Sequence, residues 1–331
     1  MLNERLHPGK IFGLASGYWQ PAALHAGVKL GVFTALAGQG VTAVELAGRL
    51  AASRRGIEGL LNALTAMELL EKTGSEYRNS PLAETFLDRN KPDDYVGHIV
   101  MHHHYLVEGW SRLDEAVLSG QPVETSSHGE ANERESFQMG MFNLAKAIAP
   151  AISASIDLSD RHHLLDLGGG PGTHAVHFCL ANPGLKATVF DRATTRPFAE
   201  KIASLYGVAE RVTFVAGDFN RDPIPGQYDV TWLSQILHSN TPEECQDLLK
   251  KTAGVMEPGG LMLIHDFFLD DNLAGPLFPA LFSLNMLINN QGRSYSAQET
   301  REMMLAVGMV DIRRLAFRGG NDSAILAGVK L

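Results

Sequence analysis

Several common features are missing from this sequence, and each absence narrows what the protein can be. The 331 residues include only two cysteines, Cys179 and Cys245, so the chain lacks the disulfide framework of small secreted domains. No apolar run is long enough to span a bilayer, and the N-terminus shows no signal pattern of basic and then apolar residues. We therefore expect a reduced, cytoplasmic protein that has no contact with a membrane.

Basic residues are also fewer than acidic residues in this sequence. The chain has 28 Lys and Arg residues against 37 Asp and Glu residues, which gives a formal net charge of −9. Proteins that bind nucleic acids neutralise phosphates with a basic surface, so we expect no nucleic-acid partner. Low-complexity segments and internal repeats are absent as well, and the length suffices for two domains.

The most informative stretch runs from Leu164 to Gly172 and reads Leu-Leu-Asp-Leu-Gly-Gly-Gly-Pro-Gly. Its apolar start predicts a buried parallel strand, and Thr173 to Leu180 predicts a helix with one apolar face. Such strand–glycine–helix turns are typical of nucleotide sites, because glycine lets the backbone approach a ligand and the helix N-terminus offers free N–H groups. The alternative interpretation is a glycine-rich turn with a purely structural role.

The glycine spacing favours one nucleotide over another. A dinucleotide fingerprint requires a small residue where this chain has Thr173. The chain instead carries Asp-x-Gly-x-Gly-x-Gly, which is the pattern of S-adenosylmethionine (SAM) methyltransferases. SAM has a sulfonium and an amino-acid end, and a nearby carboxylate suits both. We therefore expect SAM to bind at Asp166, Gly168 and Gly170.

Two further strand ends carry matching chemistry. Residues 186–190 predict a strand that ends at an aspartate, whose carboxylate can accept hydrogen bonds from both ribose hydroxyls. Residues 212–215 predict another strand, followed by an acid and an aromatic ring suited to adenine. The C-terminal half alternates strands with helices, which predicts a parallel sheet that ends in an antiparallel hairpin, with its ligand beyond the carboxyl ends of the parallel strands. The expected cofactor contacts at these two strand ends are Asp191, Gly217, Asp218 and Phe219.

His238 is the candidate catalytic residue. It follows a predicted strand at 228–233, and Asp266 follows the next strand at 261–264, so both side chains fall at the ligand-binding edge. Methyl transfer from a sulfonium requires a positioned acceptor and removal of a proton. An imidazole can accept that proton near neutral pH, while Asp266 holds the ring in the required tautomer. Alternatively, His238 caps the following helix or faces solvent.

The N-terminal third is predicted to be helical. Residues 11–36 predict one largely apolar helix, which we expect to be buried against a partner chain. Thr42 and Glu45 are predicted to form a capping box at the start of a second helix. Residues 55–70 predict a third helix, and residues 71–80 predict a small β-wing. This order resembles a winged-helix fold. A DNA-binding regulator is the rival function, but the third helix region offers only Arg54, Arg55 and Asn62 for base contacts, so a dimerisation module is favoured.

The segment that follows contains a cluster of histidines. His98 and His102 share one helical face, but no cysteine or acid completes a ligand set at a recognisable spacing, so we predict no metal site. With His103 and His104, they are interpreted as pocket or surface residues. Residues 122–135 predict a polar loop and residues 137–152 a helix.

These motifs together resemble the two-domain SAM-dependent O-methyltransferases that include acetylserotonin, caffeic acid and bacterial polyketide O-methyltransferases. The resemblance covers residues 11–331 and is strongest at 164–172, 217–219, 236–238, 243–245 and 283–287. It implies a homodimer with a winged-helix dimerisation domain, and a catalytic histidine at His238 flanked by Asp266. It further implies cofactor contacts at Ser234 and Gln235 and acceptor contacts at Phe137, Met141, Asn285 and Asn289.

Two departures from this family concern the proton acceptor. The family usually follows its histidine with Asp-Trp, whereas this chain has Ser239 and Asn240, and many members place a second carboxylate near the position of Ser294. The histidine therefore has fewer orienting partners, and sulfur, nitrogen or carbon acceptors stay open beside oxygen, as does a relative that binds SAM without transferring methyl.

The sequence thus predicts a SAM-dependent methyltransferase that acts on a hydroxyl of a small aromatic or flat secondary metabolite. The expected architecture is α/β, with a Rossmann-like sheet behind an N-terminal helical domain. The expected parts are a winged-helix dimerisation domain at 1–98, a helical linker that contributes to the substrate pocket at 99–155, and a SAM-binding domain at 156–331.

Overall fold

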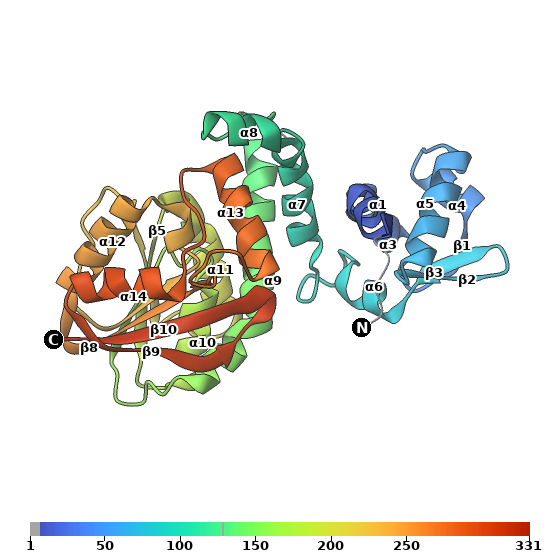
Figure 1. Cartoon of the computed structure of the whole chain (residues 1–331). Coiled ribbons are helices and arrows are strands. Elements are labelled where there is room, and N and C mark those ends of the chain that lie inside the picture. Colours follow the sequence, from blue (N-terminus) through green and yellow to red (C-terminus); the bar gives the residue numbers. More distant parts are fainter. Residues whose placement is uncertain (1–6, 128) are drawn as a thin grey trace, which may run out of the picture. The chain divides into compact units, whose positions relative to one another are not determined.

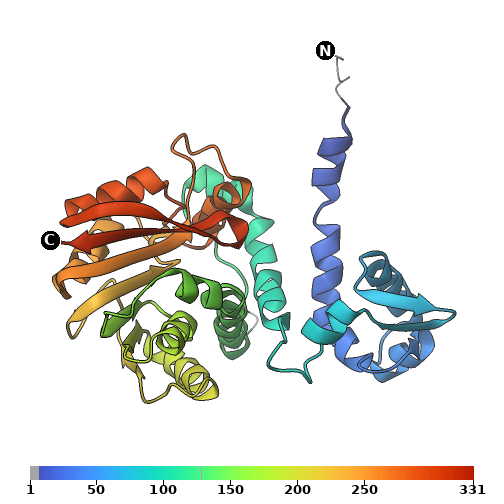
Figure 2. The same ribbon diagram turned by 90° about the horizontal axis from the view of Figure 1, so that it is seen from below.

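The computed structural model describes residues 7–127 and 129–331, which form two compact units (Figure 1, Figure 2). One unit contains the chain up to Leu106 together with Ala131–Asn143, and the other contains Val107–Glu130 together with Leu144–Leu331. The helices α7 (Gly97–Trp110) and α9 (Glu130–Ser155) contribute residues to both units. The linker expected at 99–155 is therefore divided between the units.

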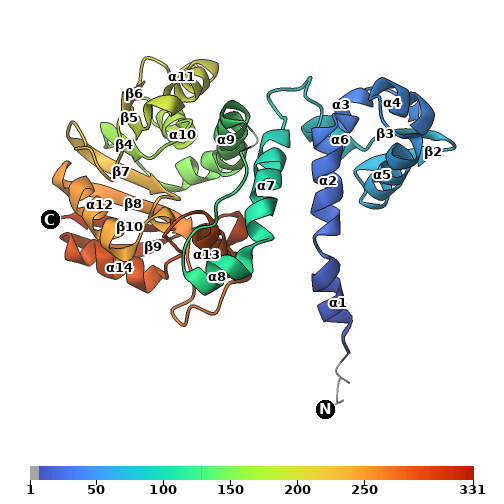
Figure 3. The ribbon, with the colours of Figure 1, turned by 90° about the horizontal axis from the view of Figure 1, so that it is seen from above.

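The second unit is built on a sheet of seven strands in the order β6-β5-β4-β7-β8-β10-β9 (Figure 3). The five strands from β6 to β8 run parallel, while β10 pairs antiparallel with both β8 and β9. The predicted parallel sheet with a closing antiparallel hairpin is confirmed. The strands are β4 (His163–Leu167), β5 (Lys186–Asp191), β6 (Val212–Ala216), β7 (Tyr228–Ser234), β8 (Met256–Phe267), β9 (Met309–Arg318) and β10 (Ser323–Lys330).

Successive side chains of a strand point to opposite faces of the sheet. Since the buried strands of this sheet are apolar on both faces, helices cover both. Leu165 packs in one core with α12 (Pro242–Gly254) and α14 (Ala297–Ala306), and Leu164 packs in the other with α10 (Thr173–Ala181), α11 (Arg196–Leu205) and the C-terminal part of α9. Each fully buried leucine contributes roughly 1.5–3 kcal/mol to folding. The cysteines are free and buried in these cores, Cys179 on α10 and Cys245 on α12.

The first unit does not contain the single helix predicted at 11–36. The chain there forms α1 (Gly9–Ser16), α2 (Trp19–Lys29) and α3 (Val32–Ala35). The break after α2 lies at Gly31, whose φ of 73° is a left-handed conformation that favours glycine. Helix α1 has no residue buried within the chain, and its burial against a partner chain stays a prediction.

The remaining elements of the first unit occur in the predicted order of helix, turn, helix and hairpin. They are β1 (Val41–Thr42), α4 (Ala43–Arg49), α5 (Arg54–Ala66), β2 (Leu70–Thr73), β3 (Glu76–Asn79) and α6 (Pro81–Phe86). The capping box is confirmed, since Thr42 Oγ1 accepts from Glu45 N at 3.3 Å and Glu45 Oε2 accepts from Thr42 N at 2.9 Å. Asn62 accepts hydrogen bonds from Tyr77 and Lys72, so its carbonyl is already used within the unit.

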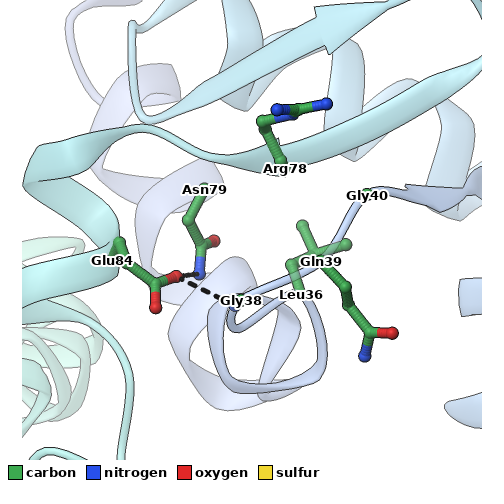
Figure 4. A pocket seen from close by; sticks show the side chains of 7 residues that line it. All are labelled: Leu36, Gly38, Gln39, Gly40, Arg78, Asn79 and Glu84. Atoms are coloured by element: carbon green, nitrogen blue, oxygen red, sulfur yellow. Dashed lines mark hydrogen bonds between the residues drawn. The ribbon is translucent and has the colours of Figure 1, made fainter.

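A small hollow of about 280 Å³ lies beside β3 (Figure 4). The Glu84 carboxylate at its edge accepts hydrogen bonds from Asn79 Nδ2 at 2.8 Å and from Gly38 N at 3.4 Å. The Asn79 hydrogen bond is the main reason that the pKa of Glu84 is lowered. Glu84 therefore links the 38–40 loop to the end of the β2–β3 hairpin and stabilises the fold of this unit. The hollow is lined by Leu36, Gly38, Gln39, Gly40, Arg78, Asn79 and Glu84.

One helix in the middle of the chain begins earlier than expected. The helix α8 (Leu113–Ser119) precedes a short loop, and α9 begins at Glu130, inside the segment predicted to be a loop. A further helix, α13 (Leu277–Asn289), lies between β8 and α14. Among the described residues, no helix combines the length and apolar character that crossing a membrane requires.

Candidate active site

The glycine turn after β4 has the geometry of a ligand cradle. Gly168, Gly170 and Gly172 have φ values of 63°, 55° and 70°, a region that disfavours other residues. A Cβ atom on Gly168 would lie 2.3 Å from Ile236 Cδ1 and 3.1 Å from Phe219 Cε1. Gly172 is the N-cap of α10, so the turn leads directly into a helix N-terminus.

Asp191 lies beside this turn at the end of β5. Its Oδ2 accepts from Gly170 N at 2.8 Å, and its Oδ1 accepts from Arg192 N at 2.6 Å and from Thr195 Oγ1 at 3.3 Å. Burial raises the pKa of Asp191, against the lowering effect of these hydrogen bonds. The carboxylate thus joins the glycine turn to the neighbouring strand end.

The Asp166 side chain is packed between the glycine turn and the start of α10 and does not point into solvent. Its side chain is buried, its Oδ2 accepts from Ala175 N at 3.2 Å, and a Cβ atom on Gly169 would lie only 2.5 Å from Asp166 Cγ. Oδ1 has no hydrogen-bond partner among the described residues. Burial raises the pKa of Asp166 to about 7. This position supports the shape of the turn, and contact between Asp166 and a cofactor stays a prediction.

The raised pKa of Asp166 predicts a pH-dependent stability. An unfolded aspartate loses its proton near pH 4, whereas buried Asp166 keeps its proton up to about pH 7. Between these values the folded state binds more protons, so this residue lowers stability by roughly 1.4 kcal/mol per pH unit as the pH rises. Asp166→Asn is therefore expected to stabilise the cofactor-free protein at pH 8 but much less at pH 5, as measured by urea unfolding. An equal effect at both pH values, or the same pH trend in the exposed Asp270→Asn control, would contradict this explanation.

The remaining predicted cofactor residues lie at the same edge. A Cβ atom on Gly217 would lie 2.3 Å from Phe190 Cζ, so this turn also requires close packing. Asp218 Oδ1 accepts from Asn220 N at 2.9 Å. At the end of β7, Ser234 Oγ is 2.8 Å from His265 Nδ1, and Gln235 has a φ of 58°.

His238 and Asp266 form a buried pair. The distance from His238 Nδ1 to Asp266 Oδ1 is 2.7 Å, and the side chains are only 8% and 6% exposed. Although burial alone raises the pKa of Asp266, the charge and hydrogen bond of His238 and the N–H of Phe267 outweigh it, so the net shift is downward. Asp266 is thus an ionised acceptor that fixes the imidazole ring, and the alternative of a solvent-facing His238 is wrong.

Aromatic side chains surround the His238 ring. Phe282 of α13 meets it edge to face at 4.8 Å between ring centroids, and Phe267 stacks at 6.3 Å. On the same helix, Asn285 Oδ1 accepts from Trp110 Nε1 at 3.0 Å, and Asn289 Nδ2 donates to the Asn285 carbonyl at 2.7 Å. Asn285 and Asn289, the two predicted acceptor contacts on α13, therefore lie on the same helix as Phe282, whose ring contacts His238.

The other predicted acceptor residues, Phe137 and Met141, belong to the first unit and lie on α9. The Phe137 ring meets His102 edge to face at 5.3 Å. Burial lowers the pKa of His102 to about 4, so the imidazole is neutral at physiological pH. Within residues 7–127 and 129–331, no three His, Cys, Asp or Glu side chains are arranged to hold a metal ion.

Several residues around His238 were not identified from the sequence. Tyr295 OH donates to the Asn240 carbonyl at 2.6 Å, and Cys245 Sγ donates to the Leu237 carbonyl at 3.2 Å. A Cβ atom on Gly292 would lie 2.0 Å from the His238 carbonyl oxygen, so only glycine fits there. The sequence signals that pointed to this region were the departures at Ser239–Asn240 and near Ser294, together with the family resemblance at residues 243–245.

Comparisons with known proteins agree with this geometry. A family model described as the O-methyltransferase domain matches residues 113–310, and one described as the O-methyltransferase dimerisation domain matches residues 12–89. The chain is 33% identical to 3-hydroxy-5-methyl-1-naphthoate 3-O-methyltransferase of Streptomyces sahachiroi, over 98% of this chain and 95% of that protein.

Two further relatives bear on the chemistry. The chain is 32% identical to the N,N-dimethyltransferase OxyT of Streptomyces rimosus, over 88% of this chain and 87% of that protein. The crystal structure of human N-acetylserotonin methyltransferase in complex with SAM superposes with a TM-score of 0.86 at 26% identity, over 100% of this chain and 99% of that chain.

Proposed function

The chain belongs to the SAM-dependent O-methyltransferase family, and from this premise we propose that it methylates a hydroxyl of a small, flat aromatic acceptor, with His238 as the proton acceptor. The observation that carries this proposal is the buried hydrogen bond of 2.7 Å between His238 Nδ1 and Asp266 Oδ1. The family uses SAM, which supplies an electrophilic methyl group when it is bound.

The residues present fit SAM. The left-handed glycines form a tight turn, and Gly168 has no room for a Cβ atom against Ile236 and Phe219. In this proposal Asp191 holds the ribose, Asp218 and Phe219 hold the adenine, and Ser234 and Gln235 line the same edge. The position of Asp191 at the carboxyl end of β5, beside the glycine turn, suits a carboxylate that accepts hydrogen bonds from the ribose hydroxyls.

The proton step follows from the geometry of the pair. Because Asp266 is ionised, it accepts the Nδ1 hydrogen of His238 and leaves Nε2 with a free electron pair. That nitrogen would accept the proton of the acceptor hydroxyl when the methyl group passes from the SAM sulfur to the hydroxyl oxygen and S-adenosylhomocysteine is released. General-base catalysis of this kind contributes about 10²–10⁴-fold, and positioning of the acceptor adds to it.

The proposed acceptor follows from the residues around His238. Phe267, Phe278 and Phe282 contact one another at centroid distances of 4.9–5.7 Å, and Asn285 lies one turn further along α13. Aromatic walls with one polar anchor suit a flat ring that carries a hydroxyl. Contact of the acceptor with Phe137 and Met141 stays a prediction from the family resemblance.

A nitrogen acceptor is the second candidate. It is supported by the similarity to OxyT and by Ser294, which is buried where many family members carry a second carboxylate. An amine gives up its proton after attack, so it depends less on a second carboxylate than a hydroxyl does.

We also propose that the protein is a cytoplasmic homodimer. The match of residues 12–89 to a dimerisation domain supports this assembly, as do exposed apolar side chains on α1, among them Phe12 and Leu14 at 65% and 74% exposure. A monomer in sizing chromatography at micromolar concentration would contradict the dimer.

The direct test is product formation. We would incubate the protein with SAM and 3-hydroxy-5-methyl-1-naphthoate, N-acetylserotonin and an amino analogue of the naphthoate, and search for methylated products by mass spectrometry. Methylation of a hydroxyl is the expected result. Methylation of the amine alone would establish the second candidate, and no product despite calorimetric binding of S-adenosylhomocysteine (SAH) would contradict both candidates.

A further inference from the structure

Two loops at the sheet edge are linked by a pair of asparagines. We call residues 217–222 the cofactor loop and residues 236–240 the catalytic turn, because the first follows β6 and the second carries His238. Asn220 Nδ2 donates to Asn240 Oδ1 at 2.7 Å, and Asn240 Nδ2 donates in turn to the Ile236 carbonyl at 2.8 Å. One continuous chain of hydrogen bonds therefore runs from the cofactor loop across the catalytic turn.

Asn240 is held firmly on its own side of this link. Asn240 is only 1% exposed, and its backbone carbonyl accepts from Tyr295 OH at 2.6 Å. Gly292 packs so closely that an added Cβ atom would lie 2.7 Å from Asn240 N. A movement of Asn240 thus requires a movement of the catalytic turn.

The cofactor loop is similarly organised up to Asn220. Asp218 N donates to Asp222 Oδ2 at 2.8 Å and Asn220 N donates to Asp218 Oδ1 at 2.9 Å, while Lys251 of α12 donates to the Phe219 carbonyl. Phe219 of this loop and Ile236 of the catalytic turn both pack over Gly168. A ligand in the glycine cradle therefore meets the two loops that the asparagines join.

We propose that Asn240 is a positioning residue that couples the cofactor loop to the catalytic turn through its hydrogen bond with Asn220. Binding of the cofactor restricts the motion of the 217–222 loop. The hydrogen bond between Asn220 and Asn240 then restricts the motion of the backbone that carries His238. The significance of this coupling for catalysis rests on the proposed function, but the coupling itself does not. In this chain Asn240 stands where the family usually has tryptophan, so the link compensates for one of the missing orienting partners.

Hydrogen exchange tests the coupling without an acceptor. The Ser239 and Asn240 amides donate to Ile236 and Leu237 carbonyls at 3.2 and 3.0 Å, so their exchange reports opening of the catalytic turn. We expect SAH to slow exchange in peptides covering both loops of the wild type. In Asn220→Ala, SAH should still protect the cofactor loop, while protection of the catalytic turn falls by about threefold or more. Asn220 is exposed, so its replacement leaves the core intact.

Two variants separate the hydrogen bond from general loosening. Asn220→Asp is nearly the same size but has no N–H to donate, so it should behave like Asn220→Ala. Asp222→Ala removes a bond within the cofactor loop and leaves the asparagine pair, so saturating SAH should still protect its catalytic turn. Undiminished protection of the catalytic turn in both Asn220 variants would overturn the proposal.

Turnover gives a second readout once an acceptor is known. Asn220→Ala should lower kcat by about tenfold with SAH affinity within about twofold, and it should cause no further loss when Asn240→Ala is already present. Equal losses in both backgrounds would overturn the coupling. Retained turnover in His238→Ala would instead contradict the proposed function, so the two failures are distinguishable.

Discussion

Replacing His238 with alanine is expected to lower kcat by about a hundredfold or more, because it removes the proposed proton acceptor. The affinity for SAH should stay within about twofold of the wild type, since the cofactor cradle is built from other strand ends. Asp266→Asn should cause a smaller loss of kcat, because the imidazole remains but loses the ionised partner at 2.7 Å. Steady-state kinetics with the methylated product as readout, combined with calorimetry for SAH, measure both quantities.

A matched histidine serves as the control for this prediction. His163 is held by hydrogen bonds to the Gln227 carbonyl and to Thr188 Oγ1, but it lies at the amino end of β4, away from the carboxyl ends of the strands. His163→Ala should leave kcat within about threefold of the wild type. Wild-type turnover in His238→Ala would show that this histidine is not the base.

Asp191→Ala is expected to produce the opposite pattern, a large loss of cofactor affinity. Hydrogen bonds to a charged group contribute about 1.5–3 kcal/mol each. Loss of two bonds to the ribose therefore weakens SAH binding by about a hundredfold or more. At saturating SAM, kcat should fall much less, because the pair of His238 and Asp266 remains in place. Isothermal titration calorimetry with SAH measures the affinity.

Loss of stability must be separated from loss of binding in this variant, since Asp191 also accepts from two backbone N–H groups. Asp229 offers a close match, because it accepts from His162 N and His163 N at 2.7 and 2.8 Å at the other edge of the sheet. Asp229→Ala should destabilise the fold by a similar amount and keep its SAH affinity. Unchanged SAH binding in Asp191→Ala would contradict the assignment of Asp191 to the ribose.

The sheet was predictable because its signals are local. The apolar runs before Asp166 and Asp191 and the glycines that follow Leu167 each act within a few residues, and each lies where it was expected. The parallel order then placed His238 and Asp266 at one edge, since connections between parallel strands bring their carboxyl ends together.

Other features were not predictable because they depend on contacts between distant residues. The link between Asn220 and Asn240 and the fit of Gly292 against His238 join segments from three different connections. Strand β8 begins at Met256 because this residue already pairs with Tyr228 of β7. The register then shifts across residues 257–260, where Gly259 has a φ of 75°, and the pairing resumes at Leu261. The burial of Asp166 beneath its own turn likewise follows from where α10 packs.

One measurement tests the proposed role of His238 most directly. We would compare kcat of the wild type with that of His238→Ala across a series of naphthol acceptors of graded acidity at one pH. If His238 removes the hydroxyl proton, the ratio of the two kcat values is large for acceptors that are protonated at the assay pH, and it falls toward one for acceptors that are already ionised. A ratio that stays the same across the series would contradict the account, because His238 would then serve only the shape of the site.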